Sequence, residues 1–273
     1  MIFMKKITTR LLSLVLLGAF IPSFVLAEIW DLGKGDITVT ATETSQTVSQ
    51  VNGETKDDPD PVITSSGKTE NTVTINAETN ATANVTLENV NINTGGAAIS
   101  TSGQGNVNIE LDGTNTVQSG TNHAGVEKNS TGTLTIKDEN NNKGSLTATG
   151  GDRGAGIGGG NDGSGSHITI SGGEVTAKGG RWAAGIGGGN NDNTVSNIGK
   201  GEHITIKDGT VTATGGDGAA GIGGGFAGAG SDITVSGGNV TATGGKDGGA
   251  GIGSGYNAGS DSATNIKIEG GDV

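Results

Sequence analysis

Short triplets of the form apolar-polar-apolar recur along this chain, with glycine pairs between them. From residue 85 onward the triplets begin at Val85, Val107, Leu134, Ile168, Ile204, Ile233 and Ile266. Alternation within a triplet places its first and third side chains on one face, which is the pattern of a β-strand. A strand of three residues cannot bury a core alone, so copies must stack on one another. The pattern predicts a repeat protein built from parallel strand ladders.

A glycine-rich segment gives the repeat its length. It reads AGIGGG at residues 155–160, 184–189 and 220–225, and AGIGSG at 250–255. The copies start 29, 36 and 30 residues apart. The six extra residues of the middle unit fall in the polar stretch 190–202, as expected for a surface loop. Each unit therefore contains an ITI-like strand, a VTA strand and an AGIG strand, with glycines at the corners.

These units predict an all-β fold, a right-handed parallel β-helix (solenoid) with three faces and about seven coils of roughly 22–36 residues. Glycine, with 55 residues, is too frequent for helices, because each helical glycine costs about 1 kcal/mol relative to alanine. Residues 28–61 should form an N-terminal strand or cap and an acidic loop, and residues 62–273 the β-helix. Since the chain stops where another VTA strand should begin, we expect a sequence truncated at its C-terminus that lacks a further domain.

Residues 1–27 predict a secretory signal peptide. Basic residues between Lys5 and Arg10 precede an apolar run at 11–20, and Ala27 ends a small-residue cleavage site. The apolar part is shorter than the roughly 20 residues of a membrane span, and no second span follows. We therefore expect a secreted protein or one on the extracellular cell surface, without a transmembrane segment after cleavage.

Charge argues against nucleic acid as a partner. The leader carries three of the 16 basic residues, so the mature chain has 13 against 28 acidic residues, a net charge of −15. Such a surface repels phosphate backbones. The chain also has no cysteine and therefore no disulfide bonds.

Several motifs resemble a known bacterial family. They are IWDL at residues 29–32, GDIT at 35–38, VTLENVNI at 85–92 and the repeated GAGIGGG with ITISGG and VTATGG. Together they are similar to the β-helical, pectin-lyase-like carbohydrate-binding domain of exported Gram-positive surface proteins. The resemblance implies non-catalytic binding of polysaccharide or cell-wall glycan, with Ca²⁺ sometimes bound, and it assigns no site residue. A purely structural or adhesive surface repeat is the first alternative, and a polysaccharide lyase or hydrolase the second.

The exceptions to the repeat are the candidate ligand-binding residues. Phe226 and Tyr256 occupy the same position after their AGIG segments, where earlier coils have Asn161 and Asn190. Trp182 lies two residues before Ala184. Stacked coils would place Phe226 and Tyr256 side by side, and exposed aromatic rings, Trp182 included, can stack on the apolar faces of sugars. Packing against the core edge or a loop is the alternative role.

Metal binding and catalysis receive weaker support. His167 and His203 precede equivalent triplets and would lie ~5 Å apart, close enough to share a metal or simply to form a polar ladder. Turn aspartates could ligate Ca²⁺, but the nonapeptide of calcium-binding β-rolls is absent, so the metal ligands stay unknown. Hydrolases need paired carboxylates, and no single coil shows a cluster of acids, bases and aromatics that departs from the repeat. We therefore predict that the protein is not an enzyme.

Overall fold

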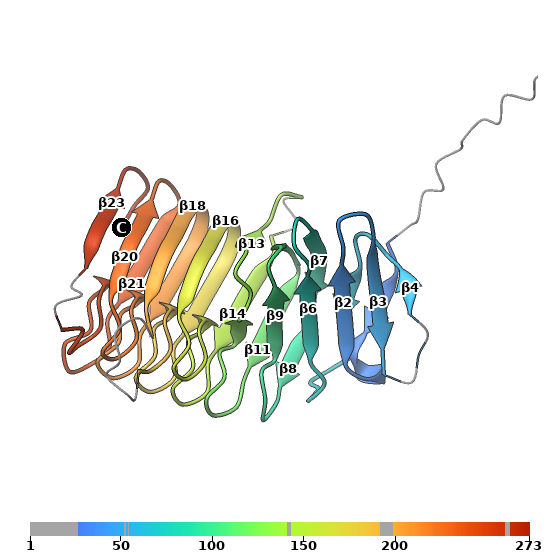
Figure 1. Ribbon diagram of the computed structural model, residues 1–273, viewed down its shortest axis with the longest axis horizontal. Helices are drawn as coiled ribbons and strands as arrows, with labels where there is room; N and C mark the ends of the chain where they lie inside the picture. Colours follow the sequence, from blue (N-terminus) through green and yellow to red (C-terminus); the bar gives the residue numbers. More distant parts are fainter. Residues whose placement is uncertain (1–26, 52, 54, 141–142, 192–198, 260–262) are drawn as a thin grey trace, which may run out of the picture.

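The computed structural model describes residues 27–51, 53, 55–140, 143–191, 199–259 and 263–273. The predicted signal peptide, apart from Ala27, lies outside these residues. The chain forms an elongated stack of coils that progresses from β1 at one end to β23 at the other (Figure 1). The described part is almost entirely β, with one short 3₁₀ helix, η1 (Leu32–Lys34). It contains no helix long and apolar enough to cross a membrane.

The first face of the coil is a parallel ladder of nine rungs. In order, the strands are β1 (Ile29–Asp31), β5 (Val62–Thr64), β7 (Thr82–Glu88), β10 (Asn106–Asp112), β13 (Leu134–Lys137), the first halves of β16 (Gly165–Lys178) and β18 (Gly201–Thr214), β20 (Gly230–Val235) and β23 (Thr264–Ile268). The seven rungs from β7 onward are those expected from the apolar triplets, and β1 and β5 add two more.

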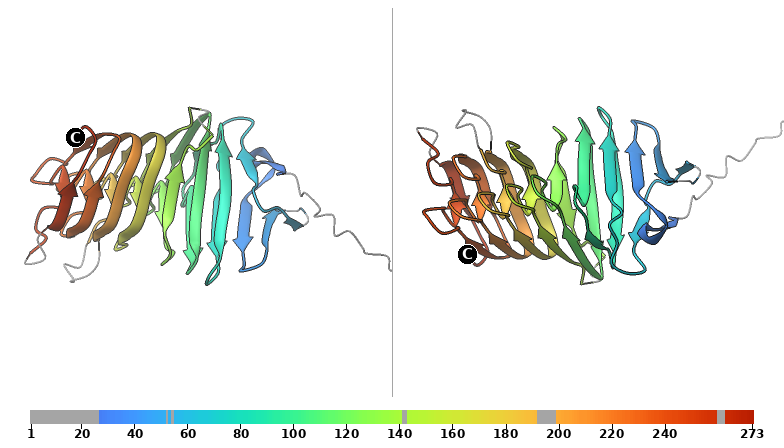
Figure 2. Two further views of the ribbon diagram at one scale, coloured as in Figure 1. Left: turned by 90° about the horizontal axis from the view of Figure 1, so that it is seen from above. Right: turned by 90° about the horizontal axis from the view of Figure 1, so that it is seen from below.

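The second and third faces complete each coil (Figure 2). The second contains β8 (Asn91–Asn93), β11 (Thr114–Gln118), β14 (Ser145–Thr149), the second halves of β16 and β18, and β21 (Asn239–Thr243). The third contains β2 (Ile37–Ala41), β6 (Val73–Ala77), β9 (Ile99–Gly103), β12 (Val126–Lys128), β15 (Ile157–Gly158), β17 (Ile186–Gly187), β19 (Ile222–Gly223) and β22 (Ile252–Gly253). This architecture is consistent with the expected right-handed parallel β-helix. β16 and β18 continue through the corner between the first two faces, and their register shifts there.

The N-terminal segment closes one end of the third face. β2 pairs in parallel with β6 on one side and antiparallel with β3 (Gln46–Gln50) on the other. β3 in turn pairs with the two-residue strand β4 (Lys56–Asp57). Buried Gln46 donates from Nε2 to the carbonyls of Asp58 and Asn84, and the Trp30 indole donates to Asp58 Oδ2 over 2.8 Å. These bonds fix the hairpin against the first coils.

The core is the predicted column of aliphatic side chains. One side chain represents each face: Ile204, Val211 and Ile222 are all 0% exposed. Burial of one such side chain stabilises the fold by about 1.5–3 kcal/mol. The expected inward ladders are thus confirmed over the central coils, whereas Ile268 in β23 is 51% exposed.

Glycine on the third face allows the coils to approach closely. Gly187 has φ +130°, and a Cβ placed on it would lie only 2.0 Å from the carbonyl oxygen of Gly223 in the next coil. Gly158 and Gly223 have the same conformation and the same kind of contact. The AGIG glycines are therefore part of the wall and do not form a ligand-cradling loop.

Candidate functional site

Two rows of turns meet along one edge of the solenoid. Backbone hydrogen bonds join these turns. In each bond, the N–H group of a residue just after the AGIG segment of one coil donates to the carbonyl oxygen of a residue just before the corresponding segment of the preceding coil. The pairs are Asn161 to Asn122, Asn190 to Arg153, Phe226 to Trp182 and Tyr256 to Gly218, at 2.6–2.9 Å. We call these eight residues the turn ridge. The four donors are the register-equivalent positions that the sequence singled out.

The acceptor residues of the turn ridge adopt a left-handed backbone conformation. Asn122 and Arg153 have φ of 73°, and Trp182 has φ of 67°. Asparagine tolerates this region, but a bulky residue rarely occupies it. Strain of this kind costs about 1–3 kcal/mol and is concentrated at functional sites. The left-handed backbone of Trp182 therefore marks this part of the ridge as a candidate functional site.

Three aromatic side chains gather on consecutive coils at this point. Trp182 and Phe226 are partly buried, and Tyr256 is 55% exposed. The Phe226 and Tyr256 rings lie 5.9 Å apart, centroid to centroid, at an interplanar angle of 43°. We call Trp182, Phe226 and Tyr256 the aromatic strip. The structure thus brings together all three aromatic residues predicted from the sequence.

Two guanidinium groups flank the tryptophan. The Cζ atom of Arg181 lies 4.0 Å from the centroid of the Trp182 ring system, and that of Arg153 lies 5.6 Å from it. Such cation–π contacts hold both the ring and the cations in place. Arg181 Nε is also 3.8 Å from Asp217 Oδ2. The strip therefore combines apolar ring surface with hydrogen-bond donors.

Glycines make room for the other two rings. Gly218 occupies the ridge position that Trp182 has in the coil before, and a Cβ on it would lie 2.8 Å from Phe226 Cδ2. A Cβ on Gly248 would lie 3.0 Å from Tyr256 Cδ2. Both glycines have positive φ, at 69° and 102°. The strip thus depends on these small residues as well as on the rings.

The two predicted asparagines lie differently. Asn190 is only 1% exposed, so its side chain lies beneath the surface of the ridge. Asn161 is partly exposed, and its Nδ2 donates to Asp162 Oδ2 over 3.1 Å. Asn161 is therefore the more accessible of the two asparagines, and Asn190 lies beneath the surface of the ridge.

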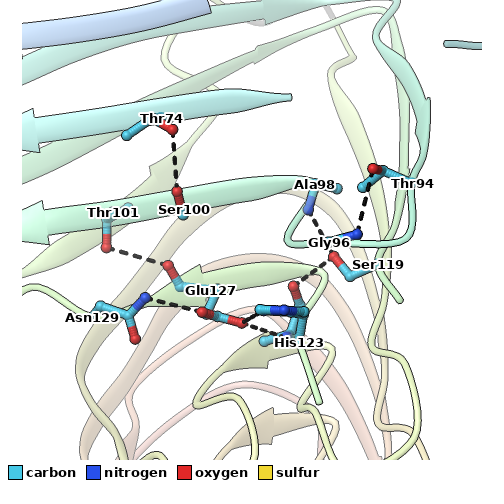
Figure 3. A network of polar contacts seen from close by, with 11 residues as sticks. Thr74, Thr94, Gly96, Ala98, Ser100, Thr101, Ser119, His123, Glu127 and Asn129 are labelled. Atoms are coloured by element: carbon cyan, nitrogen blue, oxygen red, sulfur yellow. Dashed lines mark hydrogen bonds and ion pairs between the residues drawn. The ribbon is translucent and has the colours of Figure 1, made fainter. Parts of the chain in front are cut away.

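A polar network at the other end of the ridge was missed from the sequence (Figure 3). Glu127 Oε2 accepts from Ala124 N over 3.0 Å and lies 2.9 Å from His123 Nδ1, while its Oε1 accepts from Asn129 Nδ2. The Glu127 side chain is 10% exposed. Val126 and Glu127 pair with Ile157 and Gly158 of the repeat, so the network lies in the third-face register. This register, which replaces a wall glycine by a carboxylate, was the signal available in the sequence.

The neighbouring Lys128 is an unusual buried amine. Its residue is 3% exposed, and its Nζ donates to the carbonyl oxygen of Ser130 over 2.6 Å. Burial lowers the pKa of Lys128 to about 8. The third-face strand β12 thus holds two charged side chains, Glu127 and Lys128, in buried positions.

The acidic residues do not form a metal cluster. Within the described ranges, no group of three or more His, Cys, Asp or Glu side chains could hold a metal ion. Asp162 and Asp247 occupy left-handed turn positions, a common structural role of aspartate. A groove of about 450 Å³ at the corner between the first two faces includes Asp138, Glu174 and Asp208 in its lining. These three carboxylates line the groove without forming a group that could hold a metal ion, so no ligand set is assigned to the Ca²⁺ that the family resemblance implies.

Comparison with known proteins supports the repeat architecture. A model of the Beta helix repeat matches residues 141–161, 168–190, 204–226 and 233–256. The matched segments end at Asn161, Asn190, Phe226 and Tyr256, the four donors of the turn ridge. The search of curated proteins and the search of solved structures gave no match. These four segments of the chain are thus similar to β-helix repeats, in agreement with the fold.

Proposed function

We propose that this protein is a secreted or cell-surface, non-catalytic polysaccharide-binding module whose binding surface is the aromatic strip. One observation carries the proposal: three aromatic side chains lie on consecutive coils beside two arginines. The mature chain has four aromatic residues, and the fourth, Trp30, is 7% exposed and hydrogen-bonded to Asp58. The aromatic residues outside the core are therefore concentrated on one strip.

The chemistry of the strip fits a sugar chain. The faces of Trp182, Phe226 and Tyr256 offer apolar surface to the C–H faces of pyranose rings, and each ring buried this way contributes at most about 1.5–3 kcal/mol. Arg153 and Arg181 can donate to hydroxyl or carboxylate oxygens, and a guanidinium binds a carboxylate with two parallel hydrogen bonds. Because the rings lie on successive coils ~4.8 Å apart, the polysaccharide would run along the solenoid axis.

The proposal includes a non-catalytic role, which a product assay tests. A glycoside hydrolase uses two carboxyl groups about 5–9.5 Å apart. The Trp182 ring instead contacts the guanidinium groups of Arg153 and Arg181, which suit binding. Incubation with a bound polysaccharide should therefore produce neither new reducing ends nor unsaturated uronate.

Affinity electrophoresis tests the binding. The mature chain would be run in gels that contain polygalacturonate, xylan or a soluble cellulose derivative. In a separate assay it would be mixed with insoluble peptidoglycan. Each measurement would be made with and without Ca²⁺. Trp182→Ala and Tyr256→Ala should weaken retention by about tenfold or more each, which corresponds to about 1.4 kcal/mol. Tyr256→Phe is the matched control, since it keeps the ring and should retain binding.

Two outcomes would reject the proposal. One is that no polysaccharide binds under either condition, which would favour the structural or adhesive alternative. The other is that a polysaccharide binds but Trp182→Ala and Tyr256→Ala leave retention unchanged, so that the ligand must lie elsewhere. The export part is tested separately, by locating the protein in fractions of the producing cells.

A further inference from the structure

Two histidines form a stacked pair on the surface of the first face, away from the aromatic strip. The His167 and His203 rings have centroids 4.7 Å apart and an interplanar angle of 3°. They come from equivalent positions at the start of β16 and β18. Within the described residues, no hydrogen bond holds either ring, and His203 Nε2 has an acidic neighbour, Asp232 Oδ2, at 3.8 Å. The ring nitrogens are thus available to a ligand.

The backbone fixes this pair. His167 and His203 have φ of 55° and 53°, and the strand pairing passes from Ser166 and Glu202 directly to Ile168 and Ile204. Each histidine is therefore a bulged residue in the left-handed region, which directs its side chain away from the core. Because both bulges lie between paired residues, the ladder fixes the two backbones and keeps the two imidazoles side by side.

Carboxylates lie beside the pair. Asp232 follows His203 in the same left-handed column, with φ of 52°, and its Oδ1 accepts from Asn265 Nδ2. Burial, His203 and Lys128 lower the pKa of His167, and Glu202 opposes this effect. The carboxylates of Asp232 and Glu202 thus act on the two rings with a sign that suits a cation, and Lys128 acts against them.

We propose that His167 and His203 form a two-imidazole site for a borderline divalent transition metal, Cu²⁺, Ni²⁺ or Zn²⁺, with water in the remaining positions. Imidazole nitrogens suit these metals, and Cu²⁺ should bind most tightly. Metal–nitrogen bonds of about 2.0–2.1 Å require the two nitrogens to lie about 3.3 Å apart, so the ring tips must tilt toward each other. Asp232 contributes negative charge next to the nitrogen of His203.

The chain provides its own control for this site. It has three histidines, and the third, His123, lies beside Glu127. His167→Asn and His203→Asn suit the left-handed position, which Asn265 already occupies in the same column. The test is calorimetric titration of the untagged mature chain and its variants with NiCl₂ and ZnCl₂, with thermal melts to confirm folding.

We expect one metal ion per chain, and His167→Asn or His203→Asn should weaken binding by at least about tenfold, because even second-shell partners cost about 10–100-fold. His123→Asn should bind as the unaltered protein does. With Cu²⁺, proton resonances of His167 and His203 should broaden selectively. Equal binding by the double variant His167→Asn/His203→Asn, or an equal loss in His123→Asn, would overturn the proposal. Neither result depends on glycan binding, so this site and the proposed function fail or stand separately.

Discussion

Replacing one third-face glycine with alanine should strongly destabilise the solenoid, although the change adds only one methyl group. In Gly187→Ala, the new methyl group would meet the Gly223 carbonyl oxygen at 2.0 Å, and that oxygen already accepts from Gly188 N over 2.9 Å. The backbone at φ +130° adds about 1–3 kcal/mol of strain. Overpacking adds about 1–3 kcal/mol, and the displaced hydrogen bond about 1 kcal/mol. We therefore expect a loss of about 3–7 kcal/mol.

Urea unfolding followed by far-UV circular dichroism measures this loss. Gly96→Ala is the matched control, since a Cβ on Gly96 meets nothing within 4 Å. The control should shift the free energy of unfolding by no more than about 0.5 kcal/mol, as surface substitutions usually do. Repeat proteins can lose two-state behaviour, so the slope of each transition must also be compared. If the free energies of unfolding of Gly187→Ala and Gly96→Ala differ by less than about 0.5 kcal/mol, the close approach of the coils is not what requires glycine at position 187.

Three further outcomes follow from other sites. Gly218→Ala should displace the Phe226 ring and weaken retention in polysaccharide gels while the far-UV spectrum is kept; unchanged retention would mean that Phe226 does not contact the ligand. Glu127→Ala should lower the free energy of unfolding by about 1–3 kcal/mol in urea, because the buried Ala124 N–H loses its acceptor, and a change within error would contradict this. Folding lowers the pKa of Lys128 from its ordinary 10.5 to about 8. Between these two pH values the unfolded chain therefore holds more of this proton than the folded chain does. Relative to Lys128→Met, the unaltered protein should therefore gain stability as the pH rises from 8 to 10.5, and urea midpoints that stay parallel over this range would refute the shift.

The fold could be predicted from the sequence because the repeated apolar positions are the positions of the buried side chains. Apolar residues at alternate positions, in equivalent places of successive units, have one arrangement that buries them all, and Ile204 and Val211 are both 0% exposed. The N-terminal hairpin could not be foreseen in the same way. Its strands β3 and β4 pair antiparallel outside the repeat, and Gln46 holds them through hydrogen bonds to distant carbonyls.

The candidate site was only partly predictable. Register alone placed Phe226 and Tyr256 together, and the ring distance of 5.9 Å confirms their proximity. The contacts of Trp182 with Arg153 and Arg181 required the path of the turns, which the sequence pattern does not encode. The burial of Asn190 likewise depends on how one turn covers the next, so that equal register did not mean equal exposure.

The N-terminal hairpin also limits how these molecules can associate. On that side the first face ends in β1, of three residues, and the third face ends in β4, of two residues. Very short edge strands offer too few free backbone groups to template another chain. A filament needs every subunit to have two edges that can pair, and here the edge on the N-terminal side has only short strands. The N-terminal side of the stack should therefore resist edge-to-edge pairing with another copy.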